Sequence, residues 1–174
     1  CQAMRLASEA ELELRWPTFG ATPLVLILDG VTDPRNLGAC LRSAAGAGVD
    51  AVLVPKRGSA PVNELVAKTA AGALPGLFLV EVSNLARRMK WLAEQGVWIY
   101  GTDDAAQVSW ADADYRGAVA FVLGNEAKGL RALTREHCDY LISIPMLGGV
   151  ESLNVAVATG VVLFEAVRQR GTPA

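Results

Sequence analysis

Three short segments carry the polar residues that could do chemistry in this chain. The first holds Asn36 and Arg42 near the start of an expected helix, where free backbone N–H groups attract anions. The second is G-N-E-A-K-G, in which Glu126 could accept a hydrogen bond from a ligand or hold Arg42 in place. The third is G-G-V-E-S-L-N, which presents Ser152 and Asn154. The three segments together predict a polar ligand site in which Arg42 projects toward a phosphate or a carboxylate.

Each segment also has a purely structural interpretation. Asn36 is a suitable N-cap, and Arg42 can be an ordinary surface arginine beside it. Glu126 can be a solvated acid in a tight turn, and Ser152 can be the N-cap of the last helix. Spacing alone does not decide between the two interpretations.

The order of apolar runs and helix-like segments places these residues on a sheet. Strands that alternate with helices are typical of an α/β fold, here a parallel sheet of about six strands with helices on both faces. The expected strands cover 24–29, 51–54, 78–82, 97–101, 118–123 and 140–144. The expected helices begin near residues 36, 62, 84, 130 and 152. Such a sheet binds ligands at the carboxyl ends of its strands, where the Gly124 loop and the segment after 144 would lie.

Composition bounds the class of protein. The 174 residues are 52% hydrophobic and 20% charged, which fits one compact domain and not a disordered chain. Cys1, Cys40 and Cys138 are odd in number and far apart, which favours reduced thiols in a cytoplasmic protein over disulfides or a zinc site. No apolar run reaches the ~20 residues that span a bilayer, and no secretory signal is visible. We therefore expect no membrane association and no metal.

The charges are unevenly distributed. A formal net charge of −2 does not indicate a nucleic-acid binder. Basic residues nevertheless gather in the first half of the chain and after the Gly124 loop: Arg35, Arg42, Lys56, Arg57, Lys68, Lys128, Arg131 and Arg135. This pattern fits either a locally basic face or an ordinary solvated surface.

Several enzyme classes lack their motifs here. No G-x-G-x-x-G follows the first strand, and no G-x-x-x-x-G-K-[ST] occurs, so dinucleotide-binding and P-loop sites are not expected. The single histidine, His137, has no G-x-S-x-G partner, which argues against a serine hydrolase.

The last expected helix, 152–170, is apolar on nearly every side. Leu153, Val157, Val161 and Phe164 form one stripe, and other apolar residues fill much of the rest. A helix of this kind needs covering on more than one side. The sheet can cover one side, so we predict a homodimer through this helix.

Three ordered motifs resemble those of a known family. The segments are N-L-G-A-C-L-R-S-A, V-L-G-N-E-A-K-G-L and I-P-M-L-G-G-V-E-S-L-N-V-A-V-A-T-G. They are similar to the motifs of the SpoU-type (TrmH) RNA 2′-O-ribose methyltransferases of the SPOUT superfamily. Further matches, which include D-G-V-T-D-P and L-T-R-E-H-C-D, make the branch that methylates a guanosine of 23S ribosomal RNA the most similar. The resemblance runs from about Leu24 to the end of the chain.

This resemblance implies a SPOUT fold with a C-terminal trefoil knot, a homodimer, and S-adenosylmethionine as methyl donor. It implies a donor site made of Gly101, Thr102, Leu123, Gly124, Asn125, Ile144, Met146, Leu153 and Asn154. It implies catalytic roles for Asn36, Arg42, Glu126, Ser152 and Asn154. We expect RNA contacts from Arg35, Arg42, Lys68, Lys128 and Arg131.

The resemblance also suggests a role for Arg42 in activating the ribose hydroxyl. A guanidinium stays protonated in proteins, so we expect Arg42 to stabilise the developing 2′-alkoxide. A substrate phosphate or Glu126 would then accept the proton. The alternatives are a transfer-RNA 2′-O-methyltransferase and a non-catalytic RNA-binding or ribosome assembly factor.

The ribosomal branch usually carries an N-terminal RNA-binding domain on a linker. We expect residues 1–22 to be a remnant of such a linker or tail, and 23–174 to form the catalytic domain.

Overall fold

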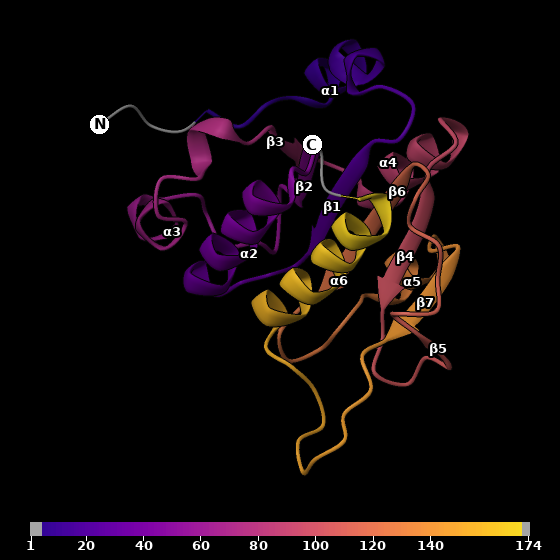
Figure 1. The fold of residues 1–174 in the computed structure, drawn as a ribbon. Coiled ribbons are helices and arrows are strands. Elements are labelled where there is room, and N and C mark those ends of the chain that lie inside the picture. Colours follow the sequence, from indigo (N-terminus) through magenta and orange to yellow (C-terminus); the bar gives the residue numbers. More distant parts are fainter. Residues whose placement is uncertain (1–4, 172–174) are drawn as a thin grey trace.

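The computed structural model describes residues 5–171, which form an α/β domain around one parallel sheet (Figure 1). The sheet has seven strands in the order β3-β2-β1-β6-β4-β7-β5. Their bounds are β1 (Leu24–Asp29), β2 (Ala51–Pro55), β3 (Leu79–Val82), β4 (Trp98–Thr102), β5 (Val108–Ser109), β6 (Val119–Gly124) and β7 (Tyr140–Ser143). The expected count of six was wrong. The additional strand is β5, whose two residues pair with β7 at the sheet edge and are too few to form a recognisable sequence pattern.

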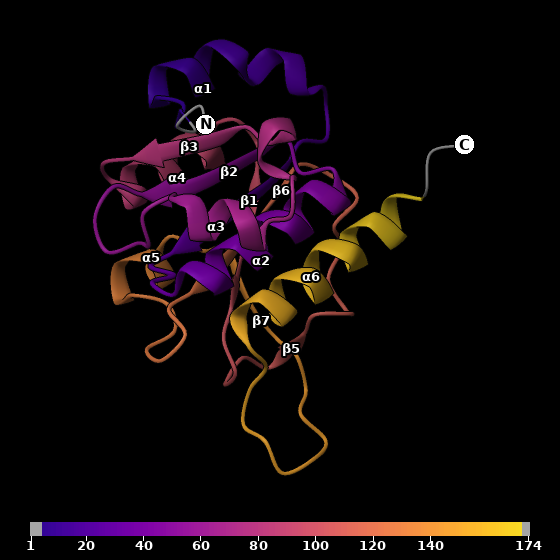
Figure 2. The ribbon, with the colours of Figure 1, turned by 90° about the vertical axis from the view of Figure 1, so that its left-hand side faces the viewer.

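Helices cover both faces of the sheet (Figure 2). They are α1 (Glu9–Arg15), α2 (Pro34–Ala47), α3 (Glu64–Thr69), α4 (Leu85–Glu94), α5 (Ala132–Glu136) and α6 (Val155–Arg170), with short 3-10 helices η1 (Trp16–Phe19) and η2 (Leu74–Gly76). Helices α2 and α6 pack against each other on one face, and α4 lies on the other. None of the helices within 5–171 has both the length and the apolar character needed to cross a bilayer.

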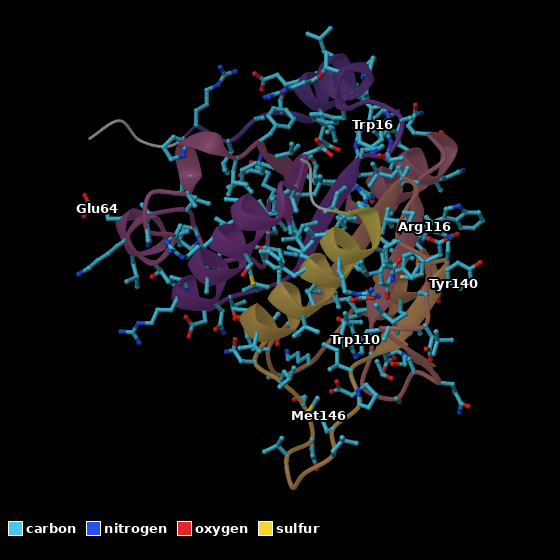
Figure 3. The ribbon with its side chains drawn as sticks, in the orientation of Figure 1. Trp16, Glu64, Trp110, Arg116, Tyr140 and Met146 are labelled. Atoms are coloured by element: carbon cyan, nitrogen blue, oxygen red, sulfur yellow. The ribbon has the colours of Figure 1, made fainter. Side chains whose placement is uncertain are left out.

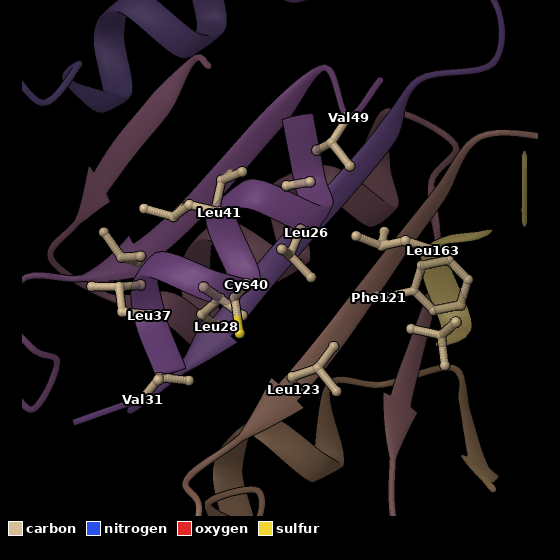
Figure 4. Packing of buried hydrophobic residues seen from close by; sticks show 14 of the residues in the cluster. Leu26, Leu28, Val31, Leu37, Cys40, Leu41, Val49, Phe121, Leu123 and Leu163 are labelled. Atoms are coloured by element: carbon tan, nitrogen blue, oxygen red, sulfur yellow. The ribbon is translucent and has the colours of Figure 1, made fainter. Parts of the chain in front are cut away.

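The core explains why β1 reads as a continuous apolar run. Leu26 and Leu28 face the cluster that includes α2 and α6, where they meet Leu37 and Leu41 (Figure 4). Val25 and Ile27 of the same strand face the cluster that includes α4. A central parallel strand is buried on both faces, so every position of it must be apolar.

The start of α2 differs from the sequence expectation. Asp33, not Asn36, is the N-cap, and its carboxylate accepts hydrogen bonds from the backbone N–H groups of Arg35 and Asn36. Pro34 follows at the first helical position, where its fixed φ favours the helix and its missing N–H costs nothing. The side chain of Asn36 is consequently not needed as a cap and is available for other contacts.

The start of α6 differs in the same way. Asn154, not Ser152, is the N-cap, and its Oδ1 accepts hydrogen bonds from the N–H groups of Ala156 at 2.9 Å and Val157 at 3.3 Å. Both Ser and Asn are good caps, and the chain simply enters the helix two residues later than expected. Ser152 therefore lies in the loop and not at the helix.

Residues 5–22 lie against the domain. Ser8 and Glu11 form a capping box at the start of α1, and Leu12 is fully buried. Arg88 of α4 forms ion pairs with Glu9 and Glu13, at 2.9 and 2.8 Å. Apolar burial and ion pairing thus attach α1 to α4 within the described part of the segment.

Arg170 ties the end of α6 to two other segments. Its Nε donates to the carbonyl oxygen of Tyr115 at 2.9 Å, and its two terminal nitrogens donate to the carbonyl oxygens of Thr22 and Gly117. One side chain therefore joins the last helix to the chain just before β1 and just before β6.

Replacing Arg170 with Met should destabilise the domain. The variant keeps an apolar stem but removes the donors to these carbonyl groups, so we expect the free energy of unfolding to fall by about 2 kcal/mol. Urea denaturation measures this. Arg116→Met is the matched control, because Arg116 pairs with Asp114 on an exposed surface and such pairs contribute about 0–1 kcal/mol. Equal losses in the two variants would contradict the role given to Arg170.

Candidate active site

A cavity of about 630 Å³ lies at the carboxyl ends of β4, β6 and β7. One wall is the turn after β6, and another is the long loop between β7 and α6. That loop extends from the body of the domain in Figures 1 and 2, and Met146 on it is labelled in Figure 3. Eight of the nine residues expected to bind the donor line the cavity: Thr102, Leu123, Gly124, Asn125, Ile144, Met146, Leu153 and Asn154. The edge of the sheet that the sequence predicted as a ligand site therefore does bear a cavity.

Gly101 has a packing role behind this cavity. It is buried and is not among the lining residues. A Cβ at this position would lie 2.7 Å from Sγ of Cys138 and 2.8 Å from Cδ1 of Leu130. A larger residue here would therefore force these two side chains to shift.

The turn after β6 closes tightly on itself. A Cβ on Gly124 would lie 2.3 Å from the carbonyl carbon of Gly129, so no larger residue fits. The backbones of Asn125 and Gly129 bond to each other in both directions, at 3.0 and 2.9 Å. The Asn125 side chain donates to the carbonyl oxygen of Gly30 at 2.9 Å. The turn is thus fixed to the segment that follows β1.

Glu126 joins this turn to the start of α2. Its Oε1 accepts hydrogen bonds from the backbone N–H groups of Thr32 at 3.1 Å and Asp33 at 3.0 Å. Its Oε2 accepts one from the Thr32 hydroxyl at 3.2 Å. The carboxylate contacts the residues that lead into α2 and not Arg42, which differs from one sequence expectation. The contact is favourable because a helix N-terminus attracts negative charge.

The same contacts shift the pKa of Glu126. Partial burial raises the pKa, but hydrogen bonds from the backbone of Asp33, of Glu126 itself and of Thr32, and from the Asn36 side chain, together lower it below its usual value. Each of these donors favours the ionised form. Glu126 is therefore a carboxylate at neutral pH, with its oxygens occupied.

Asn36 and Asn154 complete a chain of side chains across the site. Nδ2 of Asn36 donates to Glu126 at 3.4 Å, and Oδ1 of Asn36 accepts from Nδ2 of Asn154 at 3.0 Å. The Oδ1 of Asn154 caps α6, so the orientation of each amide follows from its partners. Residues far apart in sequence are thereby connected: Glu126 after β6, Asn36 on α2, and Asn154 at the start of α6.

Arg42 lies apart from this group. It is exposed on α2, is not among the cavity-lining residues, and its Nη1 is 3.5 Å from the carbonyl oxygen of Ala71. Ser152 is exposed and lines the cavity. Within one copy of the chain, the structure brings Asn36, Glu126 and Asn154 into contact but leaves Arg42 outside.

The residues expected to contact RNA have different surroundings. Arg35 on α2 and Lys68 on α3 are exposed, and Lys128 is exposed at the cavity. Arg131 is bound to Asp29, with Nε 2.7 Å from Oδ1, and Asp29 is only 1% exposed. A buried carboxylate needs such a partner, so Arg131 has a structural function in the fold.

Two features of the site were missed from the sequence. Thr32 and Asp33 hold Glu126, and the matching D-G-V-T-D-P segment could have drawn attention to them. Asp103 and Arg135 form an ion pair in the cavity wall, for which no sequence signal exists because they belong to different elements. In the part of the chain that the structure describes, no group of three or more His, Cys, Asp or Glu side chains is arranged to hold a metal ion.

Comparisons with known proteins identify the family. Residues 23–164 match the model of the SpoU rRNA Methylase family. A curated relative, the 23S rRNA (guanosine-2′-O-)-methyltransferase RlmB of Xanthomonas axonopodis, is 60% identical over 168 residues, which cover 97% of this chain and 68% of the relative.

Solved structures agree with this match. The SpoU methyltransferase AviRb of Streptomyces viridochromogenes, in complex with AdoMet, has a TM-score of 0.80 at 33% identity, covering 86% of this chain and 58% of AviRb. The A. aeolicus TrmH/SpoU tRNA modifying enzyme has a TM-score of 0.77 at 29% identity, covering 93% of this chain and 83% of that enzyme. The chain belongs to the SpoU rRNA methylase family.

Proposed function

We propose that this protein transfers a methyl group from S-adenosylmethionine to the ribose 2′-hydroxyl of a guanosine in 23S ribosomal RNA. One observation carries the proposal: Glu126, Asn36 and Asn154, one from each motif, form a connected group beside a cavity. The substrate is inferred from the similarity to RlmB.

The cavity suits the donor in size and lining. Its volume of about 630 Å³ is in the range of small-molecule sites. Ile144, Leu153 and Met146 offer apolar surface to the adenosine part, and we expect backbone groups of Gly124, Ile144 and Leu153 to hold its polar atoms. When bound, the donor supplies a methyl group on a positively charged sulfur. The protein must then mainly position the acceptor for in-line transfer.

Arg42 is proposed to stabilise the 2′-alkoxide as it forms. Its guanidinium keeps its proton, so it acts as a cation with donors and not as a base. Arg42 lies outside the cavity of its own copy. It can therefore act in a complete site only when the acceptor RNA is bound beside it or when a second copy of the chain supplies the cavity.

We propose a homodimer through α6, supported by the exposure of Val157 (52%) and Phe164 (48%) on that helix.

Glu126 is proposed to position the site and not to take the ribose proton. A carboxylate with a lowered pKa that already accepts several hydrogen bonds is a weak base. The proton would go to a phosphate of the substrate or to solvent.

The C-terminal trefoil knot remains part of the proposal and is supported by the similarity to SpoU enzymes.

A second candidate is methylation of transfer RNA, which the similarity to the A. aeolicus tRNA modifying enzyme favours. The deciding experiment measures methyl transfer from labelled donor to unmodified 23S ribosomal RNA and, separately, to unmodified transfer RNA, with mapping of the modified nucleotide. Methylation of transfer RNA alone would replace the proposed substrate. Binding of RNA without methylation of either would support the non-catalytic alternative.

Replacing Arg42 with Lys should lower the methylation rate by about 10²-fold, because the positive charge remains but the planar fork of donors is lost. Single-turnover transfer to the RNA that the wild-type protein methylates measures this. Calorimetry with S-adenosylmethionine is the control, and we expect unchanged donor affinity because Arg42 does not line the cavity. A full methylation rate in Arg42→Lys would overturn the role of Arg42.

Glu126→Gln should retain a methylation rate within about tenfold of wild type. The amide oxygen can accept from Asp33 and Asn36, and the amide nitrogen can donate to the Thr32 hydroxyl. Glu126→Ala removes all of these bonds and should reduce the rate by more than about 10²-fold. If Glu126 were the proton acceptor, the Gln and Ala variants would be equally impaired.

The Gln variant should also change the dependence of stability on pH. The pKa of Glu126 is lowered in the folded state, so its stabilising effect is complete above the ordinary glutamate pKa and is lost as the pH falls below it. Melting temperatures measured between neutral and acid pH should therefore fall less for Glu126→Gln than for the wild type. Identical profiles would contradict this assignment.

A further inference from the structure

We propose that the loop Lys56–Ser59, which follows β2, binds phosphate groups of the RNA strand that carries the acceptor ribose. We name it the β2 loop. The inference rests on the proposed function, because it assigns a binding surface for that substrate. Neither Lys56 nor Arg57 is among the residues that the family motifs indicate.

The β2 loop lies at the same edge of the sheet as the cavity. Strand β1 pairs in parallel with both β2 and β6, so the segments after these three strands emerge side by side. The N–H of Ala60 donates to the carbonyl oxygen of Val31 at 2.9 Å, directly before Thr32 and Asp33, which hold Glu126. A phosphate bound to this loop would lie beside the segment whose Thr32 and Asp33 hold Glu126.

Two glycines shape the turns that meet here. Gly30 and Gly58 have φ values of +86° and +82°, which side-chain-bearing residues rarely adopt. A Cβ on Gly30 would lie 3.6 Å from the carbonyl oxygen of Gly58, so the two turns lie close to each other. The β2 loop therefore lies beside the segment that leads into α2 and is hydrogen-bonded to it through Ala60.

The charges of the β2 loop are available to a ligand. Lys56 and Arg57 are exposed, and neither forms an ion pair with a carboxylate within residues 5–171. Arg131 and Arg135 differ, since they are paired with Asp29 and Asp103 respectively. Cations without a carboxylate partner can neutralise phosphates without first breaking an ion pair, and such contacts position a nucleic acid without reading its sequence.

Arg35 and Lys128 extend the same surface. Arg35 follows β1 and Lys128 follows β6, both are exposed, and neither has an ion-pair partner in the described part of the chain. With Lys56 and Arg57 they place basic side chains after three neighbouring strands. A chain of net charge −2 thus places four cations without ion-pair partners, within the described residues, after three neighbouring strands.

Ser59 supplies an independent observation. Its Oγ is the only buried side-chain oxygen or nitrogen in residues 5–171 that lacks a hydrogen-bond partner. An unpartnered buried hydroxyl is unfavourable, and a phosphate oxygen is a strong acceptor. A small movement of the loop on binding RNA would give this hydroxyl its partner.

The test compares two double variants that remove the same charge. One is Lys56→Gln with Arg57→Gln. The control is Arg87→Gln with Lys90→Gln on α4, whose side chains are also exposed but lie on the helix attached to α1. Affinity for the 23S ribosomal RNA transcript that the wild-type protein methylates is measured by filter binding at several salt concentrations.

We expect the β2 loop variant to bind this RNA about tenfold more weakly at physiological salt, with the slope of log affinity against log salt reduced by roughly 1.4 for two phosphate contacts. The control should stay within about twofold of wild type, and S-adenosylmethionine affinity should not change in either variant. An unchanged salt slope in the β2 loop variant, in a protein whose wild type methylates the RNA, would overturn this inference alone. A wild-type protein that methylates no RNA would instead overturn the proposed function, and this inference with it.

Ser59→Ala gives a separate readout. If the hydroxyl gains its partner only with RNA, the variant should bind RNA about threefold more weakly while the free protein melts at the wild-type temperature or higher. A lower melting temperature with unchanged RNA affinity would show a structural role and contradict the assignment of Ser59.

Discussion

The site depends on a carboxylate held at the beginning of a helix. Glu126 is placed after β6 by a glycine turn that admits no side chain at Gly124, and it receives N–H groups from Thr32 and Asp33, which lead into α2. The positive end of the helix and the negative carboxylate stabilise each other. Without this contact, Asn36 would lose one of its two partners, and the link to Asn154 would have only one fixed end.

The parallel sheet is the reason that these parts meet. All of its strands run in the same direction, so the segments after β1, β2, β4, β6 and β7 emerge at one edge even though the sequence separates them widely. Helix α6 then returns to pack against α2, which brings its N-cap Asn154 to Asn36. The polar network lies at this edge, whereas the two apolar clusters lie between the sheet and the helices on its two faces. The network therefore does not interrupt the apolar packing.

The basic side chains of the surface are of two kinds, those that form ion pairs with carboxylates and those that do not. Arg88 and Arg131 are neutralised by carboxylates and help to hold elements together, whereas Arg35, Lys56 and Arg57 have no such partner within the described residues. Net charge counts both kinds equally. For this reason net charge does not show which cations are available to a ligand, and only the location of the partners shows the difference.

The sequence by itself determined the fold class, most element positions and the family motifs, because apolar periodicity, glycines and caps act over a few residues. The family resemblance supplied the nine expected donor residues, and eight of them line one cavity at the ends of parallel strands. The sequence did not determine which residue caps α2 or α6, since Asp33 and Asn36, or Ser152 and Asn154, are locally comparable. Nor did it show that Gly101 serves packing, that β5 exists, or that Glu126 binds Thr32 and not Arg42. The contacts of Glu126 join segments about ninety residues apart. The packing of Gly101 and the pairing of β5 also join separate elements, so these outcomes are decided only when the tertiary structure brings those elements together.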